Sequence, residues 1–175
     1  MVSMTENPAS VVDEGAFTVR RSIRISAPVE KVWQAVTQPE YISRWFGRTV
    51  LDGVGVGAAG TMTFPDYGSI PLRVEEWDEP RRVAYRWNND DALGSRPEQV
   101  QEKGSTVFTF TLDEIEGGTQ LSVVETGFEN TSAPRENLES HRTGWDEELD
   151  KLVRLVEKDA VEDGAVEHDA VEGGA

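Results

Sequence analysis

The chain contains 175 residues, no cysteine, and an excess of acidic side chains that gives a formal net charge of −16. This length is typical of one domain, and the absence of cysteine excludes disulfide frameworks, thiolate metal sites and cysteine nucleophiles. The negative charge disfavours nucleic acids and anionic membrane surfaces as partners. No segment has the roughly 18 apolar residues that a membrane helix needs, and the first residues do not have the pattern of a secretion signal. We therefore expect a cytoplasmic protein.

The basic residues are mostly arginine, because the only lysines are Lys31, Lys103, Lys151 and Lys158. An acidic, lysine-poor surface is typical of proteins that stay hydrated in concentrated salt, where screening weakens the self-repulsion of the chain. A GC-rich genome and an acidic tail would give the same composition. The composition therefore leaves a halophilic origin open beside an ordinary one.

The first third of the chain predicts a flexible start, one strand and two short helices. Residues 1–15 are small and polar, which indicates a frayed terminus. Apolar residues alternate over 17–25, which is the pattern of a strand. Pro28 fits the first turn of a helix, and apolar residues then recur at helical spacing over 29–36. A second short helix follows over 40–46.

A glycine-rich run comes next. Residues 55–60 match Gly-x-Gly-x-x-Gly, the fingerprint of a dinucleotide-binding loop, which must follow a strand and begin a helix. Here the run follows a helix and precedes the strand-like residues 61–64. We therefore interpret it as a glycine-rich turn.

The middle of the chain predicts an antiparallel sheet. Alternating apolar residues mark five further strands, at 61–64, 70–76, 83–87, 106–112 and 119–126. The last two strands form a hairpin around Glu116-Gly117-Gly118. The polar loop 88–104 has a length that is uncommon unless a loop is functional or mobile. We interpret Asp90 and Asp91 within it as a solvated acidic pair.

The C-terminal third predicts a long helix and an acidic tail. Over 135–157 the apolar residues step by three or four, so they lie along one helical face. Residues 159–175 repeat Asp-Ala-Val-Glu and have no large apolar side chains besides valine, which indicates disorder. One folded domain over 16–158 remains.

The order of these elements predicts the fold class. Sequential antiparallel strands leave one face of a sheet bare, and the long amphipathic helix supplies the second layer. We therefore predict an α+β fold in which a curved antiparallel sheet of about six strands wraps on the long C-terminal helix. The two short helices follow the first strand.

Four segments, taken in order, carry a family resemblance. They are Ser26-Ala27-Pro28-Val29-Glu30-Lys31-Val32-Trp33 with Trp45-Phe46-Gly47, Val74-Glu75-Glu76-Trp77 with Tyr85-Arg86-Trp87, Gly118-Thr119-Gln120-Leu121 with Thr126-Gly127-Phe128, and His141-Arg142-Thr143-Gly144-Trp145. Together they resemble the activator of heat-shock-protein-90 ATPase homologue family, part of the START-like, or SRPBCC, superfamily. The resemblance covers about residues 17–157. It implies a helix-grip fold with a ligand-sized cavity between the sheet and the long helix.

The resemblance leaves three functions open, because a fold alone does not determine function. Members of the superfamily bind lipids, hormones and polyketides, and some are cyclases or hydrolases. We rank first the binding of a small apolar or amphipathic molecule, and second a cyclase- or hydrolase-type enzyme that uses the same cavity. A protein-interaction module with a chaperone contact comes third, since the chaperone-activating role belongs to relatives with an additional N-terminal domain. A homodimer through exposed sheet edges also stays open.

Two polar residues are the candidates for anchoring a ligand. Alternation places Glu125 on the same strand face as Leu121 and Val123, where it either points into the cavity or reaches solvent at the strand end. In a cavity its pKa would rise by desolvation unless an arginine pairs with it. His141, one turn before Trp145, is either an acid–base group or a helix residue that hydrogen-bonds to a loop. We assign no catalytic residue.

The remaining candidates are large side chains that ordinary core packing explains equally well. Gly144 costs a helix about 1 kcal/mol relative to alanine, so it either permits a close approach or opens space. The expected cavity residues are Trp33, Trp45, Phe46, Tyr85, Trp87, Phe108, Phe110, Glu125, His141, Trp145 and Leu149. We expect no metal and no cofactor, because the chain has no HExxH or EF-hand spacing and no phosphate-binding loop.

Overall fold

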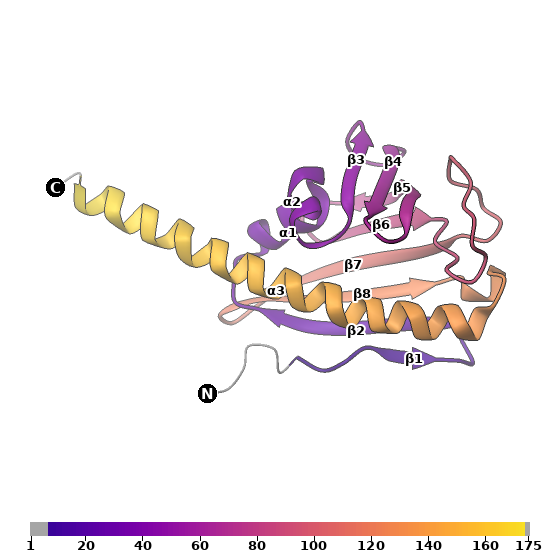
Figure 1. Ribbon diagram of the computed structural model, residues 1–175. Helices are drawn as coiled ribbons and strands as arrows, with labels where there is room; N and C mark the ends of the chain where they lie inside the picture. The colour runs from indigo at the N-terminus through magenta and orange to yellow at the C-terminus, as the bar shows by residue number, and fades with distance from the viewer. Residues whose placement is uncertain (1–6, 174–175) are drawn as a thin grey trace.

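One curved antiparallel sheet grips a long helix in the computed structural model, which describes residues 7–173, with side chains up to residue 164 (Figure 1). The sheet has eight strands in the order β1-β2-β8-β7-β6-β5-β4-β3. The strands are β1 (Val11–Asp13), β2 (Thr18–Ile25), β3 (Arg48–Asp52), β4 (Ala59–Phe64), β5 (Gly68–Asp78), β6 (Arg82–Trp87), β7 (Thr106–Ile115) and β8 (Gly118–Thr126). The helices are α1 (Val29–Thr37), α2 (Pro39–Trp45), the short η1 (Phe128–Asn130) and α3 (Pro134–Gly173). The predicted α+β helix-grip class is confirmed.

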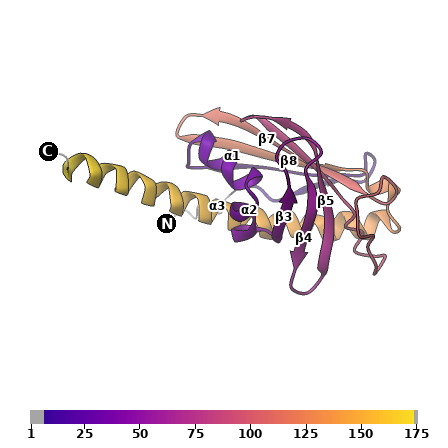
Figure 2. The ribbon, with the colours of Figure 1, turned by 90° about the horizontal axis from the view of Figure 1, so that it is seen from above.

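The inward face of the sheet is apolar because the strands alternate as the sequence predicts. On β7 the buried side chains are Thr106, Phe108, Phe110 and Leu112, and each neighbour between them is only half buried. On β8, Leu121 and Val123 face the same way. Figure 2 shows β3, β4 and β5 turned steeply against β7 and β8, so the sheet is strongly twisted. This twist makes the inward face concave.

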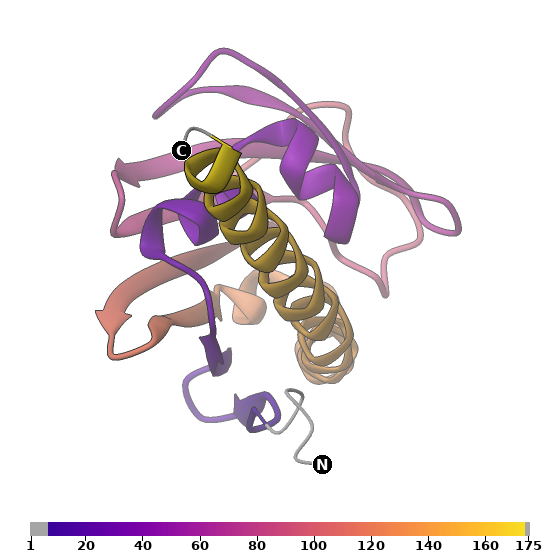
Figure 3. The same ribbon diagram turned by 90° about the vertical axis from the view of Figure 1, so that its left-hand side faces the viewer.

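The long helix α3 fills the concave face. Figure 3, which looks at the molecule from the C-terminal end of α3, shows the sheet wrapped around the helix. Its buried residues lie along one face, as in an amphipathic helix: Leu138, His141, Trp145, Leu149, Leu152, Val153 and Val156. The helices α1 and α2 cover the part of the sheet that α3 leaves open.

The sheet has eight strands rather than about six, because the sequence prediction missed both edge strands. In β3 the residues Arg48, Val50 and Asp52 are exposed, so the apolar alternation is weak. The strand exists because it pairs with β4 from Arg48 to Asp52. The glycine run at 55–60 covers the end of the turn between these two strands and the first two residues of β4, with positive φ at Gly55 and Gly57.

The start of the chain also differs from the expected flexible terminus. Strand β1 pairs with β2, and Ser10 N donates to Asp146 Oδ1 of α3 at 2.7 Å. The buried Arg21 on β2 donates to the carbonyl of Pro8 at 2.8 Å. These long-range contacts order residues whose own sequence has no strand pattern. Residues 1–6 of the expected flexible segment lie outside the described residues.

Helix α3 is longer than the predicted range of 135–157. It continues through the acidic segment to Gly173, and its last turns extend past the sheet (Figure 1). Asp159 accepts hydrogen bonds from Tyr41 Oη at 2.5 Å and from Arg44 Nη1 at 2.9 Å. These contacts fix α3 at Asp159, just beyond Lys158. The helix can then continue from there, because each residue added to an existing helix gains one backbone hydrogen bond. The structure thus differs from the expected disorder over 159–173, and residues 174–175 lie outside the described part.

None of the helices within residues 7–173 has the length and apolar character needed to cross a membrane.

Candidate functional site

Glu125 is a fully buried carboxylate on the inward face of β8, with 0% of its surface exposed. Four side chains donate hydrogen bonds to it: Trp87 Nε1 at 2.9 Å, Thr106 Oγ1 at 2.5 Å, His141 Nδ1 at 2.9 Å and Trp145 Nε1 at 2.9 Å. The donors come from β6, β7 and α3. The carboxylate therefore ties the long helix to the sheet.

The environment of Glu125 keeps the carboxylate ionised. Burial alone would raise the pKa of Glu125, but the charge of His141 and the hydrogen bonds outweigh burial and hold the pKa below its usual value. The strand-end position does not bring this side chain to solvent. Its charged partner is a histidine rather than the arginine considered from the sequence.

His141 is held between acceptors at both ring nitrogens. Nδ1 lies 2.9 Å from Oε1 of Glu125, and Nε2 lies 2.9 Å from the carbonyl oxygen of Asn89 in the 88–104 loop. A carboxylate and a carbonyl can only accept, so both nitrogens carry a proton and the ring is an imidazolium. Burial by itself would lower the pKa of His141, but the charge and hydrogen bonds of Glu125, with Asp91 and Asn89, raise it above its usual value.

These hydrogen bonds leave neither group of the pair with an unoccupied atom to act as a general base. A general base needs an unprotonated atom within reach of the proton that it removes. Both nitrogens of His141 donate to protein acceptors, and both oxygens of Glu125 accept from protein donors. The hydrogen bond from His141 to the loop is one of the two alternatives that the sequence left open.

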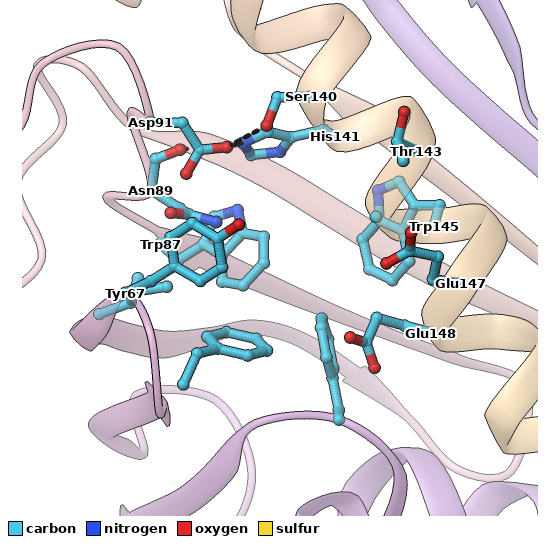
Figure 4. Close-up of a pocket in the computed structure, with 14 residues that line it drawn as sticks. Tyr67, Trp87, Asn89, Asp91, Ser140, His141, Thr143, Trp145, Glu147 and Glu148 are labelled. Atoms are coloured by element: carbon cyan, nitrogen blue, oxygen red, sulfur yellow. Dashed lines mark hydrogen bonds and ion pairs between the residues drawn. The ribbon is translucent and has the colours of Figure 1, made fainter.

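A cavity of about 390 Å³ lies beside the Glu125–His141 pair, between α3 and strands β4 to β6 (Figure 4). Its apolar wall consists of Phe46, Phe64, Ile70, Trp87 and Trp145. The indole nitrogens of Trp87 and Trp145 are already bonded to Glu125. The two tryptophans can therefore offer mainly their hydrocarbon surface to a ligand.

Four of the expected cavity residues line this cavity, and seven do not. The lining ones are Phe46, Trp87, His141 and Trp145. The buried Glu125 lies behind them, and the rest pack in the hydrophobic core: Trp33, Trp45, Tyr85, Phe108, Phe110 and Leu149.

The aromatic core leaves no ligand-sized space of its own. The void among Trp45, Tyr85, Phe108 and Phe110 measures about 10 Å³, which is at the lower limit for one water molecule. Tyr85 Oη donates to the carbonyl of Val36 at 2.6 Å. The polar atom of this tyrosine is therefore used inside the protein, and the cavity lies to one side of the core.

Gly144 faces the open space of the cavity. It lies on α3 next to Trp145, and a Cβ atom added to it would meet no atom within 4 Å. Of the two readings of this glycine, close approach or open space, the structure supports open space. A side chain at this position would occupy volume that a ligand could otherwise use.

Most of the polar wall of the cavity was not predicted from the sequence. Ser140, Thr143, Glu147 and Glu148 lie beside His141 and Gly144 on the same side of α3. Helical spacing could have found them, because residues three or four apart share a face. The prediction from sequence rested only on the apolar stripe of the helix.

The acidic pair in the 88–104 loop is not solvated surface. Asp90 is buried, and its carboxylate accepts hydrogen bonds from Ser132 and from Asn137 Nδ2 at 2.8 Å. Burial alone would raise the pKa of Asp90, but these hydrogen bonds lower it. Asp91 is half buried and lines the cavity, with Oδ2 at 2.5 Å from Ser140 Oγ. The pair attaches the loop to the start of α3. The sequence did not predict this contact, because the two segments are far apart in the chain.

Within the part of the chain that the structure describes, no cluster of three histidine or carboxylate side chains is arranged to hold a metal ion.

Comparison with known proteins identifies the fold family. The family model described as Activator of Hsp90 ATPase homolog 1-like protein matches residues 26–157. The structure of MLL2253 from Mesorhizobium loti is 27% identical and superposes with a TM-score of 0.66 over 81% of this chain and 97% of that one. No curated protein matches the chain at a significant level.

Two further solved structures share the fold at lower identity. CalU16 from Micromonospora echinospora is 21% identical, with a TM-score of 0.62 over 86% of this chain and 85% of that one. Aha1 from Colwellia psychrerythraea, described as a dimer, is 20% identical, with a TM-score of 0.63 over 80% of this chain and 96% of that one. The START-like fold expected from the sequence is confirmed.

Proposed function

Because the chain belongs to the Activator of Hsp90 ATPase homolog 1-like family, we propose that it binds a small, mostly apolar or amphipathic molecule in the cavity beside α3. The observation that carries the proposal is the aromatic-walled space of about 390 Å³ that remains open at Gly144. Ligand sites in proteins usually measure about 300–1,000 Å³. The cavity is therefore large enough for a small organic molecule.

The chemistry of the wall supports binding rather than catalysis. Phe46, Trp87 and Trp145 supply apolar area, and the bonded pair of His141 and Glu125 fixes the positions of the two tryptophans. A preorganised apolar wall lowers the entropy lost on binding. For the alternative of an enzyme that uses the same cavity, the geometry offers no free general base at His141 or Glu125, because the polar atoms of both groups are hydrogen-bonded within the protein.

Native mass spectrometry of the full chain, before and after denaturation, tests the proposal. We expect a co-purifying molecule, or an added neutral apolar probe such as naphthalen-1-ylmethanol, to bind the folded protein and to be lost on unfolding. Gly144→Leu should abolish this binding by filling the cavity. Gly164→Leu is the matched control, since Gly164 is an exposed residue of the same helix with no neighbour within 4 Å. Equal binding by the wild type and Gly144→Leu would refute the site.

Three further expectations stay predictions: the cytoplasmic location, the homodimer and the chaperone contact. The dimer described for the Colwellia psychrerythraea protein is compatible with a homodimer here. The free edges of β1 and β3 are the surfaces that would pair in it, because an edge strand presents unpaired backbone groups.

A further inference from the structure

The ionisable groups that line the cavity are unbalanced in charge. Asp91, Glu147 and Glu148 contribute carboxylates, and no arginine or lysine side chain of the described residues lines the wall. The one cationic group, His141, is paired with Glu125 at 2.9 Å and lies 3.5 Å from Asp91. The side chains that line the cavity therefore carry a net negative charge.

The acidic groups occupy two ends of the cavity. Figure 4 shows Asp91 beside Ser140 and His141 at one end, and Glu147 and Glu148 at the other. Asp91 already accepts from Ser140 and lies near two cations, His141 and Arg96. A positively charged group of a ligand would therefore bind at the other end, where the carboxylates of Glu147 and Glu148 have fewer cationic partners.

Glu148 is held in the wall as a partly desolvated carboxylate. Its side chain is 17% exposed, and Lys151 Nζ lies 2.7 Å from Oε2. Burial raises the pKa of Glu148 above its usual value. Glu147 is exposed at the same end and forms no ion pair with any described residue. Lys151 balances only one of these two negative charges, so a second cation near Glu147 and Glu148 would balance the other.

We propose that the ligand of this cavity is an organic cation, with an aromatic or apolar body against Phe46, Trp87 and Trp145 and a cationic nitrogen at Glu147 and Glu148. The inference rests on the proposed function and adds the chemical class of the ligand. Indole and phenyl faces attract cations through their quadrupole, and a carboxylate forms a charge-assisted hydrogen bond with an ammonium group. The net charge of −16 also steers cations toward the protein. An anionic ligand would meet repulsion from every free charge in the wall.

Three probes with the same ring system test the charge preference in isothermal titrations with the full chain at pH 7. They are naphthalen-1-ylmethylamine, naphthalen-1-ylmethanol and naphthalen-1-ylacetate. We expect the amine to bind about 5- to 30-fold more tightly than the alcohol, as one half-buried charged contact gives, and the carboxylate to bind most weakly. The double variant Glu147→Gln/Glu148→Gln should reduce the affinity for the amine to that for the alcohol and leave the alcohol unaffected.

A charge-matched control separates local contact from the general field of an acidic protein. Glu98→Gln/Glu162→Gln removes the same charge from exposed positions outside the cavity wall, and it should keep the preference for the amine. An equal loss of preference in this control would overturn the inference. So would an alcohol or a carboxylate that binds as tightly as the amine, although binding of either would leave the proposed function intact. Binding of none of the three probes would count against the proposed function itself, and the inference would fall with it.

Discussion

His141 Nδ1 and Glu125 Oε1 lie 2.9 Å apart and form a buried ion pair between α3 and β8. Such pairs contribute little net stability when complete, because desolvation offsets the attraction of the two charges. Removing one partner is costly, since the other charge is left buried without compensation. This pair also sets the positions of Trp87 and Trp145, because both indoles donate to the same carboxylate.

We expect His141→Leu to destabilise the protein by about 3–5 kcal/mol, because it leaves Glu125 as an uncompensated buried charge. Urea unfolding followed by tryptophan fluorescence measures the change. The double variant Glu125→Gln/His141→Leu should recover part of the loss, since the buried charge is then absent. A loss below about 1 kcal/mol in the single variant would contradict the assignment of a charged pair.

The stability contributed by the pair should depend on pH in both directions. The folded pKa of His141 is raised above 6.5, so its contribution is complete below that value and is lost as the pH rises through the folded pKa. The folded pKa of Glu125 is lowered below 4.5, so its contribution is present above that value and is lost as the pH falls through the folded pKa.

Urea midpoints measured from pH 4 to pH 10 test this dependence. The wild type should lose stability toward alkaline pH relative to Glu125→Gln/His141→Gln, a double variant without the pair. Parallel curves for the two proteins above neutral pH would show that His141 is not held as an imidazolium.

Gly144→Ala should stabilise the protein by about 1 kcal/mol, because alanine is the better helix former and its Cβ would enter open space. Differential scanning calorimetry should show a higher Tm. Gly60→Ala gives the opposite case, since its Cβ would lie 1.8 Å from the carbonyl oxygen of Val50. A lower Tm for Gly144→Ala would mean that the space beside it is filled.

Tyr41→Phe should destabilise the turns of α3 around Asp159. The variant removes the 2.5 Å hydrogen bond to Asp159 and leaves Arg44 as the partner of that carboxylate. We expect a loss of about 1 kcal/mol and faster amide hydrogen exchange near Asp159. Tyr67→Phe, at a tyrosine with 64% exposure, is the control that should change neither. Unchanged exchange near Asp159 would show that this contact does not hold the helix.

The prediction from sequence was accurate where one segment carried its own pattern. Phe108 and Phe110 alternate with polar residues and are buried on β7 as expected. It was wrong where order comes from distant partners. Strand β1 forms because it pairs with β2 and because the neighbouring Ser10 hydrogen-bonds to Asp146. Asp90 can be buried because Ser132 and Asn137 donate hydrogen bonds to its carboxylate.

The same limit applied to the site. Leu121 and Val123 on β8 already indicated that Glu125 points inward, because side chains alternate along a strand. That its partners would be His141 and two tryptophans required the helix to be placed on the sheet. Without those donors the sequence left open whether the carboxylate reached solvent.

The sequence by itself determined the family, the fold class and the buried side of the strands that it predicted, because local periodicity and motif order encode them. Only the tertiary structure decided which aromatics fill the core and which line a cavity. It also decided that the polar atoms of Glu125 and His141 are all hydrogen-bonded within the protein, and that Glu147 and Glu148 line the cavity. These properties depend on distances between segments far apart in the chain, and no pattern within one segment contains them.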